Sequence, residues 1–205
     1  MYPLLGVLIS YLAGSVSFAY LAGKARGIDL RRHGSGNLGA SNSVRVLGPR
    51  IGALVYLGDT LKGLLPVLLL PLIVSTGQPH QWAIAFGVAA VLGHVRPVFL
   101  LGKGGGKGVA TGGGVFLGLA PLPTLIATGV FALTLLVTRI SSVASLVAGV
   151  SLLVAIFFLA GPNDPLFWAS VAVMLLVIWT HRSNIGRLRR GEEPRIGHRV
   201  EVSAP

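Results

Sequence analysis

Six apolar stretches constrain this chain more than any other feature. They cover residues 3–23, 51–75, 81–101, 109–137, 142–160 and 165–181. Each is near or above the roughly 20 residues that a helix needs to cross the hydrocarbon core of a membrane. A segment in lipid has to satisfy its backbone donors and acceptors internally, so these stretches should be helical. We therefore predict an all-α integral membrane protein that forms one polytopic domain, residues 1–205.

Basic residues predict how the chain is oriented in the membrane. They fill the first long connection and the C-terminal tail, namely Lys24, Arg26, Arg31, Arg32, Arg45 and Arg50, then Arg182, Arg187, Arg189, Arg190, Arg195 and Arg199. The connections at 75–80 and 161–164 contain no Lys or Arg. Because short basic loops stay in the cytoplasm, we expect the N-terminus outside and the C-terminus in the cytoplasm. The first stretch lacks a charged leader and a cleavage site, so it should be a retained helix.

The stretch 109–137 requires a different path from the others. A single crossing there would place the basic tail outside, against the charge bias. The sequence Leu119-Ala120-Pro121-Leu122-Pro123 supplies a break, since proline removes a helical N–H donor and disfavours helix before it. We predict a helical hairpin whose first arm, Val109 to Leu119, rises about 16 Å, roughly half the core. This brings the expected number of transmembrane helical segments to about seven.

Several protein classes are excluded by composition. The chain has no cysteine, which excludes disulfides, thiolate metal sites and a cysteine nucleophile. Its formal net charge is +11, but Lys and Arg flank the apolar stretches and do not alternate with aromatic residues, so we expect no nucleic acid partner. No cluster of His, Asp and Glu has the spacing of metal ligands, so we expect no metal and no cofactor.

Two glycine-rich polar segments interrupt the apolar pattern. Residues 31–45 and 102–111 combine glycines, whose backbone N–H groups are accessible, with Ser, Asn, Arg and Lys side chains. Residues 34–39 fit the dinucleotide pattern G-x-G-x-x-G, but no β-strand precedes them, and residues 102–108 lack the hydroxyl residue of a P-loop. We expect both segments to be anion-binding loops, with flexible glycine connectors as the alternative.

Four ordered motifs resemble the signatures of the bacterial acyl-phosphate-dependent glycerol-3-phosphate acyltransferases. The first motif is Gly34-Ser35-Gly36-Asn37-x-Gly39-Ala40-x-Asn42, and the second is Asp59-x-x-Lys62-Gly63-x-x-Pro66-Val67. The third is Gly93-His94-x-x-Pro97-x-Phe99 followed by Gly105-Gly106-Lys107-Gly108-Val109-Ala110-Thr111. The last is His181-Arg182-x-Asn184-Ile185-x-Arg187-Leu188. The resemblance spans nearly the whole chain, although three glycines separate Lys103 from Lys107 where the family usually has two.

The resemblance implies a membrane acyltransferase. Such an enzyme transfers a fatty acyl group from acyl phosphate to the 1-hydroxyl of glycerol 3-phosphate, giving 1-acyl-glycerol 3-phosphate (lysophosphatidic acid) and phosphate, the first acylation of phospholipid synthesis. It further implies a multi-pass protein of the bacterial cytoplasmic membrane whose site faces the cytoplasm, in contact with membrane lipids and functionally linked to the enzyme that makes acyl phosphate. We expect a monomer, with the acyl tail in an apolar groove between helices.

The same resemblance assigns candidate site residues. Those expected to be catalytic are Ser35, Arg45, Lys107, His181 and Asn184. Those expected to bind substrate or phosphate are Gly34, Gly36, Asn37, Gly39, Asn42, Asp59, Lys62, His94, Lys103, Gly104, Gly105, Gly106, Gly108 and Thr111. Both substrates carry phosphate, so bringing them together requires cations and backbone donors, and Arg45 and Lys107 are the strongest candidates.

Alternatives remain for individual residues. Ser35 could donate a hydrogen bond or act as a nucleophile, but no Ser-His-Asp arrangement is visible to activate it, and we favour the donor. A general base is one reading of His94 and His181, and a hydrogen-bonded structural role is the more common one. Asp59 and Lys62 lie one helical turn apart in an apolar stretch, where an internal ion pair and direct substrate contact are equally plausible.

A transporter for organic phosphates is the alternative from another class, because it would also use basic loops and a broken helix. However, no inverted repeat is evident, and the basic loops all fall on one side. Acyltransferases that use coenzyme A or acyl carrier protein have a His-x4-Asp motif, whereas no histidine here has Asp five residues later. The sequence therefore favours an acyl-phosphate-dependent enzyme.

Overall fold

The computed structural model describes residues 1–74 and 77–197, and its regular structure within them is helical. The α-helices are α1 (Pro3–Ser15), α2 (Phe18–Lys24), α3 (Ala40–Leu47), α4 (Pro49–Ile73), α5 (Pro79–Val95), α6 (Val109–Leu119), α7 (Pro121–Thr138), α8 (Ser141–Ala160), α9 (Pro165–Thr180) and α10 (Arg182–Arg189). Two short 3₁₀ turns, η1 (Leu30–Arg32) and η2 (Val98–Leu100), lie between helices. The predicted all-α class is confirmed.

Five helical segments in the described part of the chain are long and apolar enough to cross a membrane. They are Pro3–Lys24, Pro49–Ile73, Pro79–Leu100, Pro121–Thr138 and Ser141–Ala160. The pair α9 and α10, bent by 56° at their junction, makes a sixth if it is counted as one span. Helix α6 is apolar but has only 11 residues, so the half-length arm that was predicted from the sequence is present.

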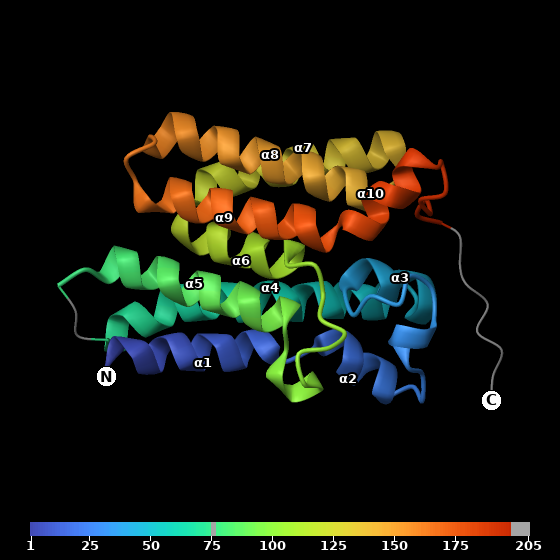
Figure 1. The fold of residues 1–205 in the computed structure, drawn as a ribbon, viewed down its shortest axis with the longest axis horizontal. Coiled ribbons are helices and arrows are strands. Elements are labelled where there is room, and N and C mark those ends of the chain that lie inside the picture. Colours follow the sequence, from blue (N-terminus) through green and yellow to red (C-terminus); the bar gives the residue numbers. More distant parts are fainter. Residues whose placement is uncertain (75–76, 198–205) are drawn as a thin grey trace.

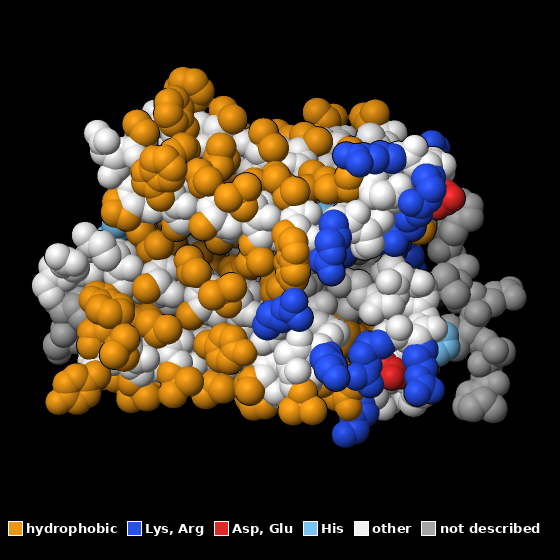
Figure 2. Space-filling view, viewed as in Figure 1, with side chains coloured by type: hydrophobic (Ala, Val, Ile, Leu, Met, Phe, Trp, Pro, Cys, Tyr) orange, Lys and Arg blue, Asp and Glu red, His pale blue; other side chains and the backbone are white. Residues whose placement is uncertain are grey.

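The helices pack in layers, with α6 in the middle (Figure 1). On one side, α1, α4 and α5 pack together, and on the other α8 packs against both α7 and α9. Basic side chains gather at the end of the molecule that contains α2, α3 and α10, whereas the rest of the same face is largely apolar (Figure 2). The basic residues that the sequence concentrates in a few connections therefore also lie together at one end of the folded protein.

The break predicted at proline is present between α6 and α7. Helix α6 ends at Leu119, Ala120 leaves the helical region with φ −145° and ψ 72°, and α7 begins at Pro121. Helix α7 returns toward the end of the molecule at which α6 begins (Figure 1). The two helices form a hairpin, and the start of α8 thereby comes close to the loop before α6.

Glycines let the first turns of α6 pack directly on α4. A Cβ at Gly63 of α4 would overlap the carbonyl oxygen of Thr111, and one at Gly114 of α6 would overlap that of Thr60. Small residues permit such backbone contact between membrane helices. The position of the α6 N-terminus is consequently fixed by α4.

Two expectations need correction. The stretch 3–23 is not one continuous helix, because α1 and α2 are separated at Val16 and Ser17. The Ser17 side chain accepts a hydrogen bond from the Tyr20 amide and caps α2, while the carbonyl of Val16 is left to accept one from Lys62. Second, the segment 31–45, expected to be a loop throughout, ends in helix α3, whose inner face buries Asn42, Ser43 and Arg45 against the rest of the fold.

Candidate functional site

The first glycine-rich segment is held in shape by Asn42. Its side-chain oxygen accepts a hydrogen bond from the Ser35 amide at 2.8 Å, and its amide nitrogen donates to the carbonyls of Leu30 (3.2 Å) and His33 (3.1 Å). Gly34 has φ +61°, and a Cβ there would overlap the Asn42 oxygen. Asn42 therefore organises the loop, and the exposed Ser35 hydroxyl makes no hydrogen bond to any described residue.

The second segment is fixed at both ends of its glycine run. The Gly106 amide donates to the carbonyl of His94 at 3.1 Å, and the Thr180 hydroxyl donates to the carbonyl of Lys107 at 3.0 Å. Gly108 adopts φ +86° and precedes the first residue of α6. Lys107 is thus placed at the start of α6, as the sequence predicts.

The two glycine-rich segments are in contact with each other. Such contact is necessary if both segments are to contribute to one anion-binding site. A Cβ added at Gly104 would lie 3.1 Å from the Arg31 side chain, and one at Gly106 would lie 3.0 Å from the carbonyl of Leu38. Arg31 and Leu38 belong to the first segment. Lys103 is exposed, whereas Lys107 is half-buried.

A polar cluster forms where Lys107 meets the C-terminal segment. The Lys107 ammonium donates a short hydrogen bond to the side-chain oxygen of Asn184, whose amide donates to Glu193 Oε1 at 2.5 Å. The Ser142 hydroxyl donates to the same oxygen at 2.8 Å, and Arg187 Nε lies 2.8 Å from Glu193 Oε2. Because Ser142 lies in the first turn of α8 and Lys107 precedes α6, this cluster also ties together the two ends of the hairpin.

Arg45 joins the cluster from α3. It is 8% exposed, and its Nη2 donates to the carbonyl of Pro194 at 3.3 Å. Its buried Nε has no hydrogen-bond partner among the described residues. Such an orphaned donor is uncommon in a folded protein. Arg45, Lys107 and Arg187 surround one carboxylate, Glu193, so the cluster carries an excess of positive charge that suits an anionic ligand.

The surroundings shift the pKa values of these groups. Burial lowers the pKa of Lys107 to about 8; Glu193 opposes this shift, and Arg187 and Arg45 reinforce it. Burial would raise the pKa of Glu193, but hydrogen bonds from Asn184, Ser142 and Arg187 outweigh it and the net pKa is lowered. At neutral pH the cluster therefore contains a lysine ammonium and a carboxylate.

His181 lies at the corner between α9 and α10 and is 2% exposed. Its Nδ1 is 2.8 Å from the carbonyl of Val177. A carbonyl can only accept, so we assign the proton to Nδ1, which leaves Nε2 as the acceptor. This hydrogen bond fixes the ring in the manner of a structural histidine and leaves one nitrogen for another partner.

Three further predicted residues form a separate, buried cluster. Lys62 Nζ lies 2.8 Å from Asp59 Oδ1 and donates to the carbonyl of Val16 at 2.6 Å. His94 Nδ1 lies 3.6 Å from the same Asp59 oxygen. The internal ion pair, one of the two alternatives left open by the sequence, is present. Neither here nor in the rest of the described residues could a group of three His, Asp or Glu side chains share a metal ion.

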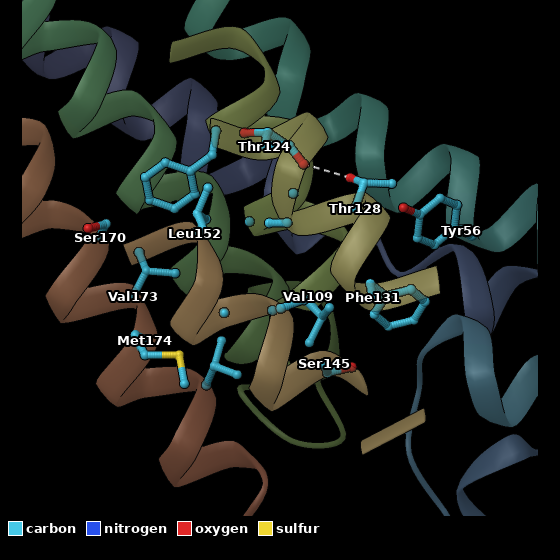
Figure 3. Close-up of a pocket in the computed structure, with 18 residues that line it drawn as sticks. Tyr56, Val109, Thr124, Thr128, Phe131, Ser145, Leu152, Ser170, Val173 and Met174 are labelled. Atoms are coloured by element: carbon cyan, nitrogen blue, oxygen red, sulfur yellow. Dashed lines mark hydrogen bonds between the residues drawn. The ribbon is translucent and has the colours of Figure 1, made fainter. Parts of the chain in front are cut away.

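An apolar cavity of about 120 Å³ begins beside Lys107 at Gly108. It runs between α6, α7, α8 and α9, and Figure 3 shows Phe131, Leu152, Val173 and Met174 around it. The polar groups near it are hydroxyls such as those of Thr124 and Ser145. A lipid tail could lie in this cavity with its polar end at the start of α6.

Glu193 is the site residue that sequence reasoning missed. It is 8% exposed and binds three of the other side chains in the cluster. The available signal was an acidic residue in a strongly basic tail. Of the predicted residues, Arg45, Lys107 and Asn184 are brought together around it, whereas Asp59, Lys62 and His94 are not.

Comparison with known proteins identifies the family. The family model for glycerol-3-phosphate acyltransferase matches residues 4–191. The chain is 44% identical over 198 residues to a glycerol-3-phosphate acyltransferase of Prochlorococcus marinus (strain NATL1A), covering 95% of this chain and 98% of that relative. It is 46% identical over 186 residues to one of Geotalea daltonii, covering 90% and 92%.

Solved structures agree with the sequence relatives. The crystal structure of PlsY (YgiH), an integral membrane glycerol 3-phosphate acyltransferase, in its glycerol 3-phosphate form matches with a TM-score of 0.88 at 39% identity, over 95% of this chain and 96% of that one. Its lysophosphatidic acid form matches with a TM-score of 0.85 at 38% identity, over 96% of each chain. Because the family model, the sequence relatives and the solved structures each match nearly the whole chain, the chain belongs to the glycerol-3-phosphate acyltransferase family.

Proposed function

We propose that this acyltransferase uses acyl phosphate as its donor and acylates the 1-hydroxyl of glycerol 3-phosphate. The hydroxyl oxygen attacks the acyl carbonyl carbon, the bond from that carbon to the phosphate oxygen breaks, and phosphate leaves with the electron pair. The hydroxyl proton passes to a phosphate oxygen, so the step needs no protein nucleophile. The products are 1-acyl-glycerol 3-phosphate and phosphate.

The observation that carries this proposal is the junction between Lys107 and the apolar cavity at Gly108. Acyl phosphate has a charged head joined to a long apolar tail, and the junction places a cation next to the opening of an apolar cavity. The first amides of α6 add donors to an anion there, since a helix N-terminus carries a partial positive charge. The buried Thr111 hydroxyl, in the first turn of α6, has no hydrogen-bond partner among the described residues.

In this proposal, Lys107 and Arg45 neutralise the two phosphates and stabilise the charge that develops on the carbonyl oxygen. The excess of cations around Glu193 supports this role. Asn184 orients Lys107, the Ser35 hydroxyl donates to substrate, and His181 presents Nε2 toward the site. The glycines of both segments leave their amides accessible to phosphate.

We further propose that the basic end of the molecule faces the cytoplasm of a bacterium, with the protein acting as a monomer in the cytoplasmic membrane beside the enzyme that makes acyl phosphate. The charge asymmetry in Figure 2 supports this orientation. Single cysteines at the exposed positions Ser41 and Gly104 should react with a membrane-impermeant maleimide only after the cytoplasmic face is opened. A cysteine at Gln78 should react in intact cells, and the reverse pattern would overturn the orientation.

A direct assay tests the donor. The purified protein in lipid is given glycerol 3-phosphate together with palmitoyl phosphate or with palmitoyl-coenzyme A, and lysophosphatidic acid is measured. We expect turnover with palmitoyl phosphate and none with the thioester. Equal rates with both donors would show that the acyl phosphate assignment is wrong, while leaving the acyltransferase family unaffected.

A further inference from the structure

The Asp59–Lys62–His94 cluster has no task in the proposed reaction, although it places charged groups deep inside the protein. Asp59 is 1% exposed, and Lys62 and His94 are each 6% exposed. The Lys62 ammonium is already occupied by Asp59 and by the carbonyl of Val16. Charged groups within apolar helices are costly and usually serve a specific purpose.

His94 connects this cluster to the second glycine-rich segment. On one side its Nδ1 faces Asp59, and on the other its Nε2 lies where a side chain at position 106 would begin, because a Cβ there would overlap that nitrogen. Its backbone carbonyl accepts the Gly106 amide at 3.1 Å. Gly106 is therefore in contact with both the ring and the backbone of His94.

The other side of Gly106 is closed by the first glycine-rich segment. A Cβ at Gly106 would come within 3.0 Å of the carbonyl of Leu38, so this glycine occupies a narrow slot between His94 and Leu38. The neighbouring Gly105 is packed differently, because a Cβ there would overlap the carbonyl of Val95. Lys107 follows Gly106 directly, so the slot determines where the Lys107 chain begins.

We propose that Asp59, Lys62 and His94 are positioning residues that hold the two glycine-rich segments in register, and that they do not themselves contact substrate. The Asp59–Lys62 ion pair supports the His94 ring, which forms one side of the slot. Lys62 also binds the carbonyl of Val16, which has no helical partner because of the break between α1 and α2. His94 then sets the position of Gly106, and through it that of Lys107. A run of glycines is too flexible to hold this geometry alone. The proposal rests on the proposed function in that the positioned segments bind the substrate phosphates.

A double-mutant cycle tests the contact between His94 and Gly106. Gly106→Ala should weaken glycerol 3-phosphate binding on the order of tenfold, because the new methyl group meets the His94 ring. His94→Ala alone should weaken it less. The double variant should bind more tightly than Gly106→Ala, since the ring that causes the overlap is gone, although the Leu38 carbonyl prevents full recovery.

Two matched glycine substitutions are the controls. Gly105→Ala meets backbone, so His94→Ala should not rescue it. Gly129 has open space around it, so Gly129→Ala should bind like the wild type. Strictly multiplicative effects of His94→Ala and Gly106→Ala, or equal rescue of Gly105→Ala, would overturn the proposal. Calorimetric binding of glycerol 3-phosphate is the measurement, so the result does not depend on the donor.

A second variant separates positioning from substrate contact. Asp59→Asn combined with Lys62→Met removes both charges and avoids a lone buried charge. Hydrogen exchange of the amides at 104–106 should become faster, and the KM for glycerol 3-phosphate should rise on the order of tenfold, the size of a lost supporting contact. The kcat at saturating substrate should stay within a few-fold of wild type.

A kcat loss as large as that of a Lys107 variant, or unchanged exchange at 104–106, would show that the pair does not act by positioning. If the double variant does not fold, the cycle of His94 and Gly106 decides the question alone. A wild type that ignores palmitoyl phosphate would disprove the proposed donor, whereas the binding and exchange experiments would still test the positioning role.

Discussion

Two clusters of charged residues lie at the basic end and in the interior of this protein, and they differ in how their charges are balanced. The single carboxylate of Glu193 is outnumbered by three cations, those of Arg45, Lys107 and Arg187. In the interior, the Lys62 ammonium is satisfied by Asp59 and a backbone carbonyl. The first cluster has spare capacity for an anion, and the second has none.

The difference separates binding from support. A charge whose partners are all internal stabilises one arrangement of the chain, and removing either partner leaves the other stranded in a medium that solvates it poorly. A cation that lacks an equal number of neighbouring carboxylates can bind an anionic ligand. Without the ligand, the repulsion between such cations lowers the stability of the folded state. Substitutions should therefore affect folding in one cluster and chemistry in the other.

We expect the largest effect on folding stability when the Asp59–Lys62 ion pair is broken. Lys62→Met leaves Asp59 buried without its counterion, so the free energy of unfolding should fall by about 3–5 kcal/mol. Thermal unfolding in detergent measures it. Lys107→Ala is the matched comparison and should change the melting temperature little, because it removes one of three neighbouring cations. Equal melting temperatures for the two variants would remove the distinction between the clusters.

Activity should show the opposite order. We expect Lys107→Ala to lose on the order of 10²–10³-fold in kcat, the scale for deleting one preorganised donor to a transition state. Single-turnover rates at saturating acyl phosphate give the chemical step directly. An active Lys107→Ala enzyme would mean that another cation, such as Lys103, stabilises the reacting groups.

The pH dependence sharpens the assignment to Lys107. Since its pKa is lowered to about 8, the ammonium is present below that pH and is lost above it. The kcat/KM should therefore fall about tenfold per unit above pH 8. Lys107→Arg, whose guanidinium stays charged, should lack this decline. Glu193→Gln should move it to lower pH, because the Glu193 carboxylate raises the pKa of Lys107. A wild-type profile that matches that of Lys107→Arg would exclude Lys107 as the titrating group.

The smallest effect is expected at Lys103. It is exposed and separated from Lys107 by three glycines, so its charge acts at a loosely defined position. Lys103→Ala should raise the KM for glycerol 3-phosphate a few-fold with little change in kcat, in line with a solvent-exposed charge pair. Steady-state kinetics beside Lys107→Ala test this, and a dead Lys103 variant next to an active Lys107 variant would reverse the assignment of the two lysines.

Much of the fold could be predicted because membrane helices obey local rules. Chain segments in lipid must be helical, so the apolar stretches predicted the positions of most of the helices. Pro121 correctly predicted that α6 ends at Leu119. The sequence analysis did not predict the break between α1 and α2, where Ser17 caps α2 and the carbonyl of Val16 accepts a hydrogen bond from Lys62 of another helix. Helix α3 was hidden by glycines and polar residues that resemble a loop.

For the site, the sequence by itself determined which residue types were available: two basic, glycine-rich segments and a C-terminal motif with His181 and Asn184. It did not determine which charges are free and which are paired. Tertiary structure decided that Lys62 is neutralised internally while Lys107 meets Asn184 and Glu193. The physical reason is that the charge balance around an ionised group depends on side chains that are distant along the chain and neighbours only after the helices pack.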